Sequence, residues 1–442
     1  MGIQDLAEIQ TSPGQTEFMS PERRKRILFL SGVDFKEKSI QVIRKTPEAY
    51  VKAGWEVHYI VGRDNSVNGD YFYESVINPD GVIIHRFIVP LTKIHGLLNN
   101  VYWKAFWFRI RNILLVLTLA LKAMKLIREK DFHIIYGYEI PGVLAVRFMR
   151  FLAVRTSAKV ITRFQGVLYV KEWLRKNQKF RFYSNWDAML ALKAKADLCI
   201  MTNDGSQGLK VLKEINSPNK NILFCSNGVD IVQLNPQMTE DIRKEQYADR
   251  SKKYLLSISR LDDHKRIDRS LRVIHKMVSK FEFTNFRFIV IGGGSEYQNL
   301  TKLAETLNIR PYVEFLGPIK HNFVQYHLAL SDLFISMYTS TNVGNPLLEA
   351  IRHNKVIITL NNGDTGDWIK HMKSGLIYDV DDDKDLSLAD YEKIAGDIIQ
   401  VLKSPDLYNR LLQGVKDVER AKLWTWEERF EAELERVEQV LT

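Results

Sequence analysis

The stretch SDLFISMYTSTNVGNPLLEAI, residues 331–351, contains a short apolar run, a turn and the start of a helix. The apolar run has the length of a buried strand. Gly344 frees the backbone of the turn, Asn345 can cap the helix, and Pro346 suits the first helical position because it needs no amide partner there. The stretch therefore predicts one strand–turn–helix unit, with Glu349 about one turn inside the helix.

The same unit recurs along the whole chain. In the first half, apolar runs separated by helix-length segments occupy residues 26–32, 55–62, 81–89, 132–139, 158–166, 196–204 and 221–228. In the second half, they occupy residues 253–260, 286–294, 313–317, 331–338, 355–360 and 374–380. Strands that are apolar throughout and alternate with helices indicate parallel sheets covered on both faces. We predict an α/β fold of two doubly wound, Rossmann-like domains whose ligands bind beyond the carboxyl ends of the strands.

The length of 442 residues also favours more than one domain. Residues 231–250 combine a high charge density with no strand pattern, so we place the domain junction there. The expected organisation is a flexible tail over 1–25, a first domain over 26–235, a second domain over 236–420 and a C-terminal helix over 421–442. We expect this last helix to pack back toward the first domain.

The composition, with 45% hydrophobic and 26% charged residues, is typical of a soluble globular protein. Cys199 and Cys225 are too few for a disulfide framework and lie in strand-like runs, so we expect buried thiols and a reducing compartment. The first residues show no basic stretch leading into an apolar core, so a secretory signal is not expected. These features favour the cytoplasm.

The net charge of +10 is concentrated in residues 101–181, which hold 17 basic and 4 acidic side chains, a net of 17 − 4 = +13. A charge of that sign favours an anionic partner such as a nucleic acid, a phospholipid surface or a phosphorylated substrate. Within this window, the helix-like segment 103–126 has an uncharged part, 112–121, that is too short to cross a membrane. Its aromatic and basic start leaves two interpretations, a buried helix or an interfacial one.

A basic loop follows the first strand of the second half. The stretch SISRLDDHK, residues 257–265, places Arg260 and Lys265 at the end of this strand, where the two cations can converge on a diphosphate. The alternative is a solvated loop whose cations pair with Asp262 and Asp263. A glycine turn with Gly292 and Gly293 follows the next strand and lets the backbone approach a ligand. It lacks the full G-x-G-x-x-G spacing, so a nicotinamide cofactor is not supported.

Six motifs in order resemble the retaining GT-B glycosyltransferases of family four, also called glycosyl transferases group 1. The resemblance is close over about residues 222–380, and the motifs are NGVDIVQLNP (227–236), SRLDDHK (259–265), IGGGSE (291–296), VEFLGPI (313–319), NVGNPLLEA (342–350) and NNGDTGDWIKHMKSGLIY (361–378). In the first half, the agreement lies mainly in strand order. The resemblance implies a GT-B fold with an acceptor-binding first domain and a donor-binding second domain.

The resemblance also implies roles for particular residues. Arg260 and Lys265 would bind the diphosphate of a nucleotide-sugar donor, and Glu349 its ribose. Gly317 and Ile319 would lie against the base, and Thr341 with Asn342 would offer hydrogen bonds to the sugar. The remaining donor contacts would come from the glycine turn and from the helix start, which attracts phosphate through its exposed amides: Gly292, Gly293, Gly344, Asn345, Pro346, Leu347 and Leu348.

The chain departs from the family at several positions. Thr341 stands where the family has its first Glu, Gln165 stands where a His often precedes Gly166, and Arg266 replaces the Gly after the Lys. Asp367 stands near a usual Glu. Enzymes of this class are thought to use no protein nucleophile, because the leaving diphosphate takes the acceptor's proton, so catalysis rests on positioning and charge stabilisation. We therefore expect the site to be active despite Thr341.

Glu139, Gln165 and Gly166 end strands of the first domain, and we expect them on the acceptor or sugar side of the cleft. Neither a cofactor nor a metal is expected, because histidines and carboxylates do not cluster with ligand spacing. We predict a retaining hexosyltransferase that uses a nucleoside diphosphate sugar, with UDP favoured. Its acceptor would be a lipid-linked saccharide or a growing glycan at an anionic, cytoplasmic membrane face. Alternatives are a soluble transferase that makes a small conjugate or extends a polymer, and a non-catalytic GT-B subunit; nucleic-acid binding is not favoured.

Overall fold

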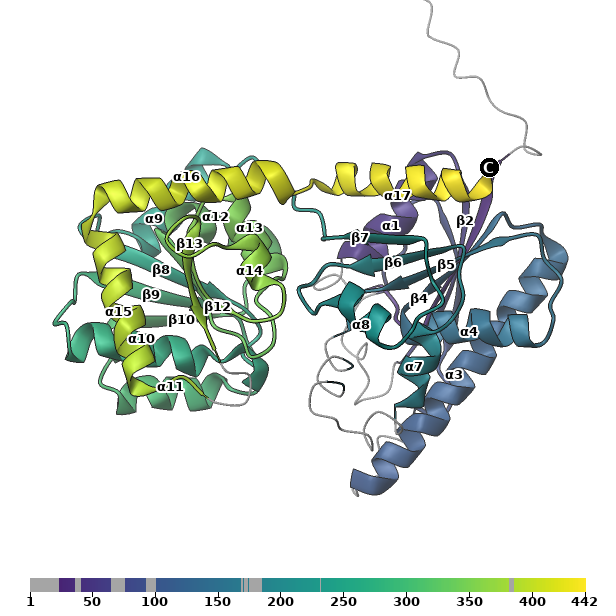
Figure 1. The fold of residues 1–442 in the computed structure, drawn as a ribbon, viewed down its shortest axis with the longest axis horizontal. Helices are drawn as coiled ribbons and strands as arrows, with labels where there is room; N and C mark the ends of the chain where they lie inside the picture. Colours follow the sequence, from purple (N-terminus) through teal and green to yellow (C-terminus); the bar gives the residue numbers. More distant parts are fainter. Residues whose placement is uncertain are drawn as a thin grey trace, which may run out of the picture.

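Two parallel sheets organise the part of the chain that the computed structural model describes, which comprises residues 24–35, 41–64, 76–92, 101–167, 170, 174, 185–230, 232–380 and 385–442. Each sheet forms the centre of one domain, and the two domains lie side by side (Figure 1). The predicted α/β fold with two doubly wound domains is confirmed. The expected tail, residues 1–25, lies outside the described residues except for its last two.

The first sheet has the strand order β3-β2-β1-β4-β5-β6-β7, and every pair is parallel. Its strands are β1 (Arg26–Ser31), β2 (Glu56–Arg63), β3 (Val82–Ile88), β4 (Ile134–Tyr138), β5 (Lys159–Phe164), β6 (Leu198–Thr202) and β7 (Ile222–Cys225). The strand order reverses between β1 and β4. Ligands of such sheets bind at the carboxyl ends of the strands beside this reversal.

The second sheet has the order β10-β9-β8-β11-β12-β13 and is also parallel. Its strands are β8 (Lys253–Ile258), β9 (Phe286–Ile291), β10 (Val313–Gly317), β11 (Leu333–Ser336), β12 (Val356–Asn361) and β13 (Gly375–Asp379). Here the order reverses between β8 and β11. The loops after these two strands carry Arg260, Lys265 and Thr341, so the reversal lies at the predicted donor site.

Helices cover both sheets (Figure 1). Those of the first domain are α1 (Gln41–Lys52), α3 (Val101–Glu129), α4 (Glu139–Phe151), α7 (Trp186–Leu192) and α8 (Gly208–Glu214). Those of the second domain are α9 (Pro236–Gln246), η2 (Asp263–Lys265), α10 (Ile267–Ser279), α11 (Tyr297–Thr306), η3 (Arg310–Tyr312), α12 (His321–Leu330), α13 (Asn345–Arg352), α14 (Thr365–Trp368), α15 (Leu388–Lys403) and α16 (Pro405–Lys422). The last helix is α17 (Trp426–Leu441).

Helix α17 returns to the first domain, whereas α16 lies on the second (Figure 1). Trp426 and Val437 of α17 belong to the apolar core of the first domain. Glu433 of the same helix is fully buried and accepts hydrogen bonds from the Tyr136 hydroxyl (3.0 Å) and from Arg163 (3.2 Å) of the first sheet. The first domain is therefore completed by a helix from the far end of the chain.

Helix α3 is buried at its centre and exposed at its start. Leu119 is fully buried, whereas Tyr102, Trp103 and Phe106 are 85%, 57% and 50% exposed. Figure 1 shows this end of α3 projecting away from both sheets. Among the helices of the described residues, none has both the length and the apolar character needed to cross a bilayer.

Candidate functional site

Arg260 and Lys265 lie together in the loop that leaves β8. The Arg260 side chain is 80% exposed and its Nη1 atom lies 3.1 Å from Asp262. The Lys265 ammonium lies 3.9 Å from the centre of the Tyr338 ring, which follows β11. A cation over an aromatic face is attracted by the ring, so Tyr338 fixes Lys265 at the reversal of the strand order.

Lys265 holds its charge at an energetic cost. Burial, and after it the positive charge of Arg260, lowers the pKa of Lys265 to about 8, against the opposing effect of Asp262. A bound anion between the two cations would reverse this effect because opposite charges favour the ionised form. The geometry thus offers a place for a diphosphate.

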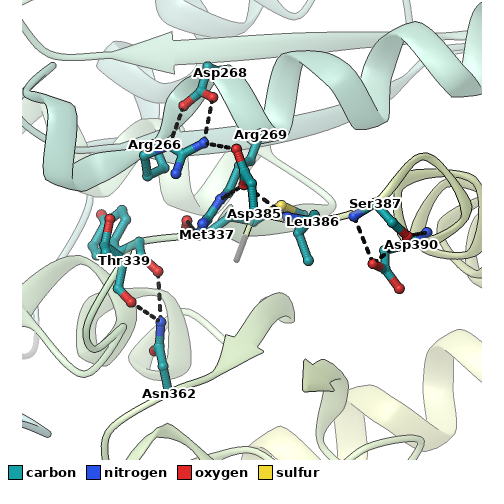
Figure 2. A network of polar contacts seen from close by, with 11 residues as sticks. Arg266, Asp268, Arg269, Met337, Thr339, Asn362, Asp385, Leu386, Ser387 and Asp390 are labelled. Atoms are coloured by element: carbon teal, nitrogen blue, oxygen red, sulfur yellow. Dashed lines mark hydrogen bonds and ion pairs between the residues drawn. The ribbon is translucent and has the colours of Figure 1, made fainter. Parts of the chain in front are cut away.

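Arg266 follows Lys265 in a left-handed backbone conformation, with φ of 45°. Glycine adopts this conformation without strain, which explains why the family motif has Gly there. The guanidinium of Arg266 bonds both Asp268 (2.9 Å) and Asp385 (2.6 Å), and Arg269 bonds the other oxygen of Asp385 (2.9 Å), as Figure 2 shows. These ion pairs fix the loop that presents Lys265.

Glycines bring the strand-end loops of the second domain into backbone contact. A Cβ atom on Gly292, whose φ is +139°, would lie 1.7 Å from the carbonyl oxygen of Ser259. The Gly292 amide also donates to the carbonyl of Gly317 (2.9 Å). A Cβ atom on Gly293 would make ordinary contact with Pro318, and Gly317 has open space around its Cβ position. Ile319 packs against the apolar core and does not stand free in the loop.

The predicted phosphate-binding helix is α13, and its start differs from the expectation. Asn345 does not cap the helix, because Gly344 is the N-cap residue and the Asn345 carboxamide accepts a hydrogen bond from Asn227 (3.1 Å) at the domain junction. The amide of Leu348 already donates to Gly344 (3.1 Å), and Pro346 has no amide proton. This leaves the amides of Asn345 and Leu347 at the open end of the helix.

Glu349 points into a cavity of about 210 Å³. Its side chain is 10% exposed and lies 3.6 Å from His321. Burial, and after it the charge of Asp230, raises the pKa of Glu349 to about 8. The cavity lies between the two domains and the last helix, since its lining includes Gly228, Asp230, His321, Asn345, Glu349 and Trp426. A buried carboxylate facing a cavity suits a ligand with hydroxyl donors.

The side chains of Asn342 and Thr341 have partners within the protein. Asn342 is buried; its oxygen accepts from the Tyr338 amide (2.9 Å) and its nitrogen donates to Asn362 (2.9 Å). The Thr341 hydroxyl donates to the carbonyl of Asp204 in the first domain (3.2 Å) and accepts from the Val343 amide (3.1 Å). The two residues thus shape the turn before α13.

The residues predicted on the acceptor or sugar side lie together at the carboxyl ends of β4 and β5. Glu139 has a left-handed backbone (φ 56°) and its carboxylate accepts from the Gln165 amide (2.6 Å). The Gln165 side chain donates to the Tyr138 hydroxyl. Burial raises the pKa of Glu139 to about 7. Residues with a strained backbone cluster at active sites and ligand-binding sites, so Glu139 is a candidate site residue.

Asp204 belongs to this group, although sequence reasoning did not select it. Gly166 has a φ of +155°, and a Cβ atom there would lie 1.9 Å from the Asp204 carboxylate. Burial raises the pKa of Asp204 to about 6 against the lowering effect of its hydrogen bonds from Ser206, and the charge of Asp364 adds to the rise. The available signal was a second acidic residue directly after an apolar strand, in the run 196–204.

In the described parts of the chain, no three His, Cys, Asp or Glu side chains are close enough to hold a metal ion. Both cysteines are buried and unpaired with each other, as expected for inert thiols.

Comparison with known proteins places the donor-side motifs in a family. Residues 238–417 match the family model of the glycosyl transferases group 1. The second domain is a glycosyl transferases group 1 domain. The predicted family resemblance is confirmed for these residues. The group 1 domain contains Arg260, Lys265, Thr341 and Glu349.

The chain also has curated relatives. The chain is 28% identical over 205 residues to N-acetyl-alpha-D-glucosaminyl L-malate synthase of Bacillus anthracis, which covers 46% of this chain and 50% of that protein. It is 28% identical over 142 residues to the phosphatidylinositol N-acetylglucosaminyltransferase GPI3 subunit of Saccharomyces cerevisiae strain YJM789, covering 32% and 31%. The chain thus matches half or less of the length of these relatives.

A solved structure extends the fold comparison to both domains. HepE of Anabaena, crystallised in complex with UDP, superposes with a TM-score of 0.67 at 14% identity, covering 94% of this chain and 100% of that one. The likeness shows that the first domain joined to the group 1 domain has the GT-B arrangement.

Proposed function

We propose that the whole chain is a retaining glycosyltransferase that uses a nucleoside diphosphate sugar as donor. The observation that carries the proposal is the pair of cations in the group 1 domain, Arg260 and Lys265, which lie beside each other with the Lys265 charge destabilised. A diphosphate satisfies both cations, with Arg supplying a planar fork and Lys a point charge.

The chemistry follows from this arrangement. Charge that develops on the leaving diphosphate is stabilised by Arg260, Lys265 and the open amides of α13. The acceptor hydroxyl loses its proton to the leaving diphosphate oxygen on the same face of the sugar. The bond from the anomeric carbon to the diphosphate breaks while the bond to the acceptor oxygen forms, so the configuration is retained. In this reaction the protein positions the two substrates and supplies no nucleophile.

We favour a UDP-linked hexose or N-acetylhexosamine as the donor. HepE was crystallised with UDP, and both curated relatives carry an N-acetylglucosaminyl group in their names. Glu349 would accept hydrogen bonds from the ribose in the cavity it faces.

We favour an acceptor at an anionic membrane, a lipid-linked saccharide or a growing glycan, reached from the cytoplasmic face. The exposed aromatic start of α3 and the charge of +13 over residues 101–181 supply the two signals that reversible anchoring needs. One relative is named for phosphatidylinositol. A soluble acceptor remains the second candidate, because the same positive window attracts any anionic substrate.

Thermal unfolding with UDP, GDP, ADP and their sugars tests the donor. A ligand that binds the native state raises its stability in proportion to its affinity, so one nucleotide series should raise Tm. Proton NMR of the product then reports the anomeric configuration. The absence of a shift with every nucleotide, or an inverted product, contradicts the proposal.

A further inference from the structure

Three short segments of the two domains meet beside the predicted ligand sites. The loop after β6, residues 203–207, meets residues 340–343 and 363–364 of the group 1 domain. Three hydrogen bonds join them: Thr341 Oγ1 to the Asp204 carbonyl (3.2 Å), the Asp364 amide to the Gly205 carbonyl (2.9 Å) and Gln207 Nε2 to the Gly363 carbonyl (3.4 Å). We refer to this set of contacts as the interdomain clasp.

At two positions of the clasp, the backbone segments lie too close together to leave room for a side chain. Gly205 has a φ of +76°, and a Cβ atom there would lie 2.1 Å from Thr341 Oγ1 and 2.7 Å from Val343 Cβ. Gly363 has a φ of +57°, and a Cβ atom there would lie 2.1 Å from the Gly205 carbonyl. Both glycines are therefore needed for the backbones to approach.

Thr341 takes part in the interdomain clasp through its side-chain hydroxyl. Its hydroxyl is a donor to the Asp204 carbonyl and at the same time an acceptor from the Val343 amide. A carboxylate cannot donate to a carbonyl, so the Glu that the family has here could not make the first bond.

On this basis we propose that Thr341 is a positioning residue that seats the Asp204 loop on the group 1 domain instead of contacting the donor sugar itself. The loop carries Asp204, whose carboxylate lies over Gly166 beside the strand end that bears Gln165. Thr341 thus fixes the acceptor-side groups relative to Arg260 and Lys265. The inference rests on the proposed function for its kinetic consequence, but the contact itself can be tested without turnover.

The matched pair Thr341→Val and Thr341→Ser tests the role of the hydroxyl. Valine keeps the shape and removes the hydrogen bond, so kcat should fall about tenfold while the Kd for UDP stays within about twofold, because the diphosphate ligands are untouched. Serine keeps the hydroxyl and should restore most of kcat. Gly205→Ala should lower kcat at least as much by steric exclusion. Thr301→Val, which removes a hydroxyl bonded within α11, is the control.

Hydrogen exchange of the same proteins reports the clasp directly. The amides of Asp364 and Val343 should lose protection in Thr341→Val and Gly205→Ala, and keep it in Thr341→Ser and Thr301→Val. Unchanged protection and unchanged kcat in Thr341→Val overturn the proposal, as does a loss of UDP affinity as large as the loss of kcat. If the unmodified protein transfers no sugar, the proposed function fails, and the exchange result alone decides whether Thr341 holds the clasp. Thr341→Glu should also lose protection and activity; a gain of activity overturns the inference.

Discussion

The two domains share one architecture but differ in the charges at the carboxyl ends of their strands. The loops of the group 1 domain present Arg260 and Lys265, and Lys265 is held as a cation with its pKa lowered to about 8. The corresponding ends of the first domain present Glu139 and Asp204, whose pKa values burial raises to about 7 and about 6. Cations suit a diphosphate and carboxylates suit sugar hydroxyls, so the proposed function assigns a different ligand to each copy of the fold.

Glu139 and Asp204 keep their positions only while the first domain is folded. We expect this folding to depend on α17. Glu433→Ala should lower the free energy of unfolding by about 3 to 5 kcal/mol, because it leaves the buried guanidinium groups of Arg163 and Arg429 without their counter-charge. Urea unfolding measures the loss. The exposed Glu427→Ala, on the same helix, is the control, and an equal stability of both variants would contradict the anchoring role of Glu433.

Removal of Arg260 or Lys265 should weaken binding of the diphosphate. Charge-assisted bonds to phosphate contribute roughly 1.5 to 3 kcal/mol each, so Arg260→Ala or Lys265→Ala should weaken UDP binding at least about tenfold. Titration calorimetry measures the affinity, and the exposed Arg272→Ala on α10 is the matched control. Unchanged affinity in both variants would remove the proposed diphosphate site.

Glu349 tests whether a carboxylate also serves the donor side. Glu349→Ala should weaken donor binding by about 1 to 3 kcal/mol, since ribose hydroxyls or neighbouring donors lose their acceptor. The loss should appear in the Kd for UDP and be absent for inorganic pyrophosphate, which has no ribose. Equal losses for the two ligands would show that Glu349 supports the fold of the site instead.

The pH dependence of binding sharpens the contrast between the two cations. Lys265 has a pKa of about 8 and loses its charge as the pH rises through that value, whereas Arg260 stays charged. In a Glu349→Gln background, which removes the opposing titration of Glu349, UDP affinity should fall above about pH 8 by up to about tenfold per pH unit. Lys265→Arg in the same background should abolish the fall. A flat profile before that substitution contradicts the role of Lys265.

The smallest expected effect concerns the surface of the first domain. Co-sedimentation with vesicles should require acidic lipid and decrease with salt, because exposed charges are screened within about 8 Å at physiological ionic strength. Trp103→Ala should weaken it by about 1 kcal/mol or more, and Phe281→Ala, an exposed aromatic of the group 1 domain, should leave it unchanged. Equal binding to neutral vesicles would contradict the membrane role and would favour a soluble anion as the ligand of residues 101–181.

Local patterns in the sequence selected the candidate donor residues. Arg260 and Lys265 occur in one loop, and Glu349 lies at helical spacing inside α13, so short stretches of sequence were enough to select them. The cap of α13 was predicted wrongly. The Asn345 carboxamide accepts a hydrogen bond from Asn227, which lies 118 residues earlier in the chain, and so does not cap the helix. Asp204 was missed because its importance depends on Gly166 and Thr341, and no local spacing relates them.

The alternation of apolar strands with helices, and with it the two doubly wound domains, can be predicted from the sequence alone. Each strand of a parallel sheet is covered on both faces, so its sequence is apolar throughout. The sequence also determined the order of the donor-side motifs. The contacts of Thr341 could not be predicted from the sequence and follow from the folded structure. Its hydroxyl donates to the carbonyl of Asp204, 137 residues away, where Gly205 and Gly363 let the two backbones approach closely. The sequence shows which residue type occupies a position. Its hydrogen-bond partner in the other domain depends on how both domains fold and pack against each other.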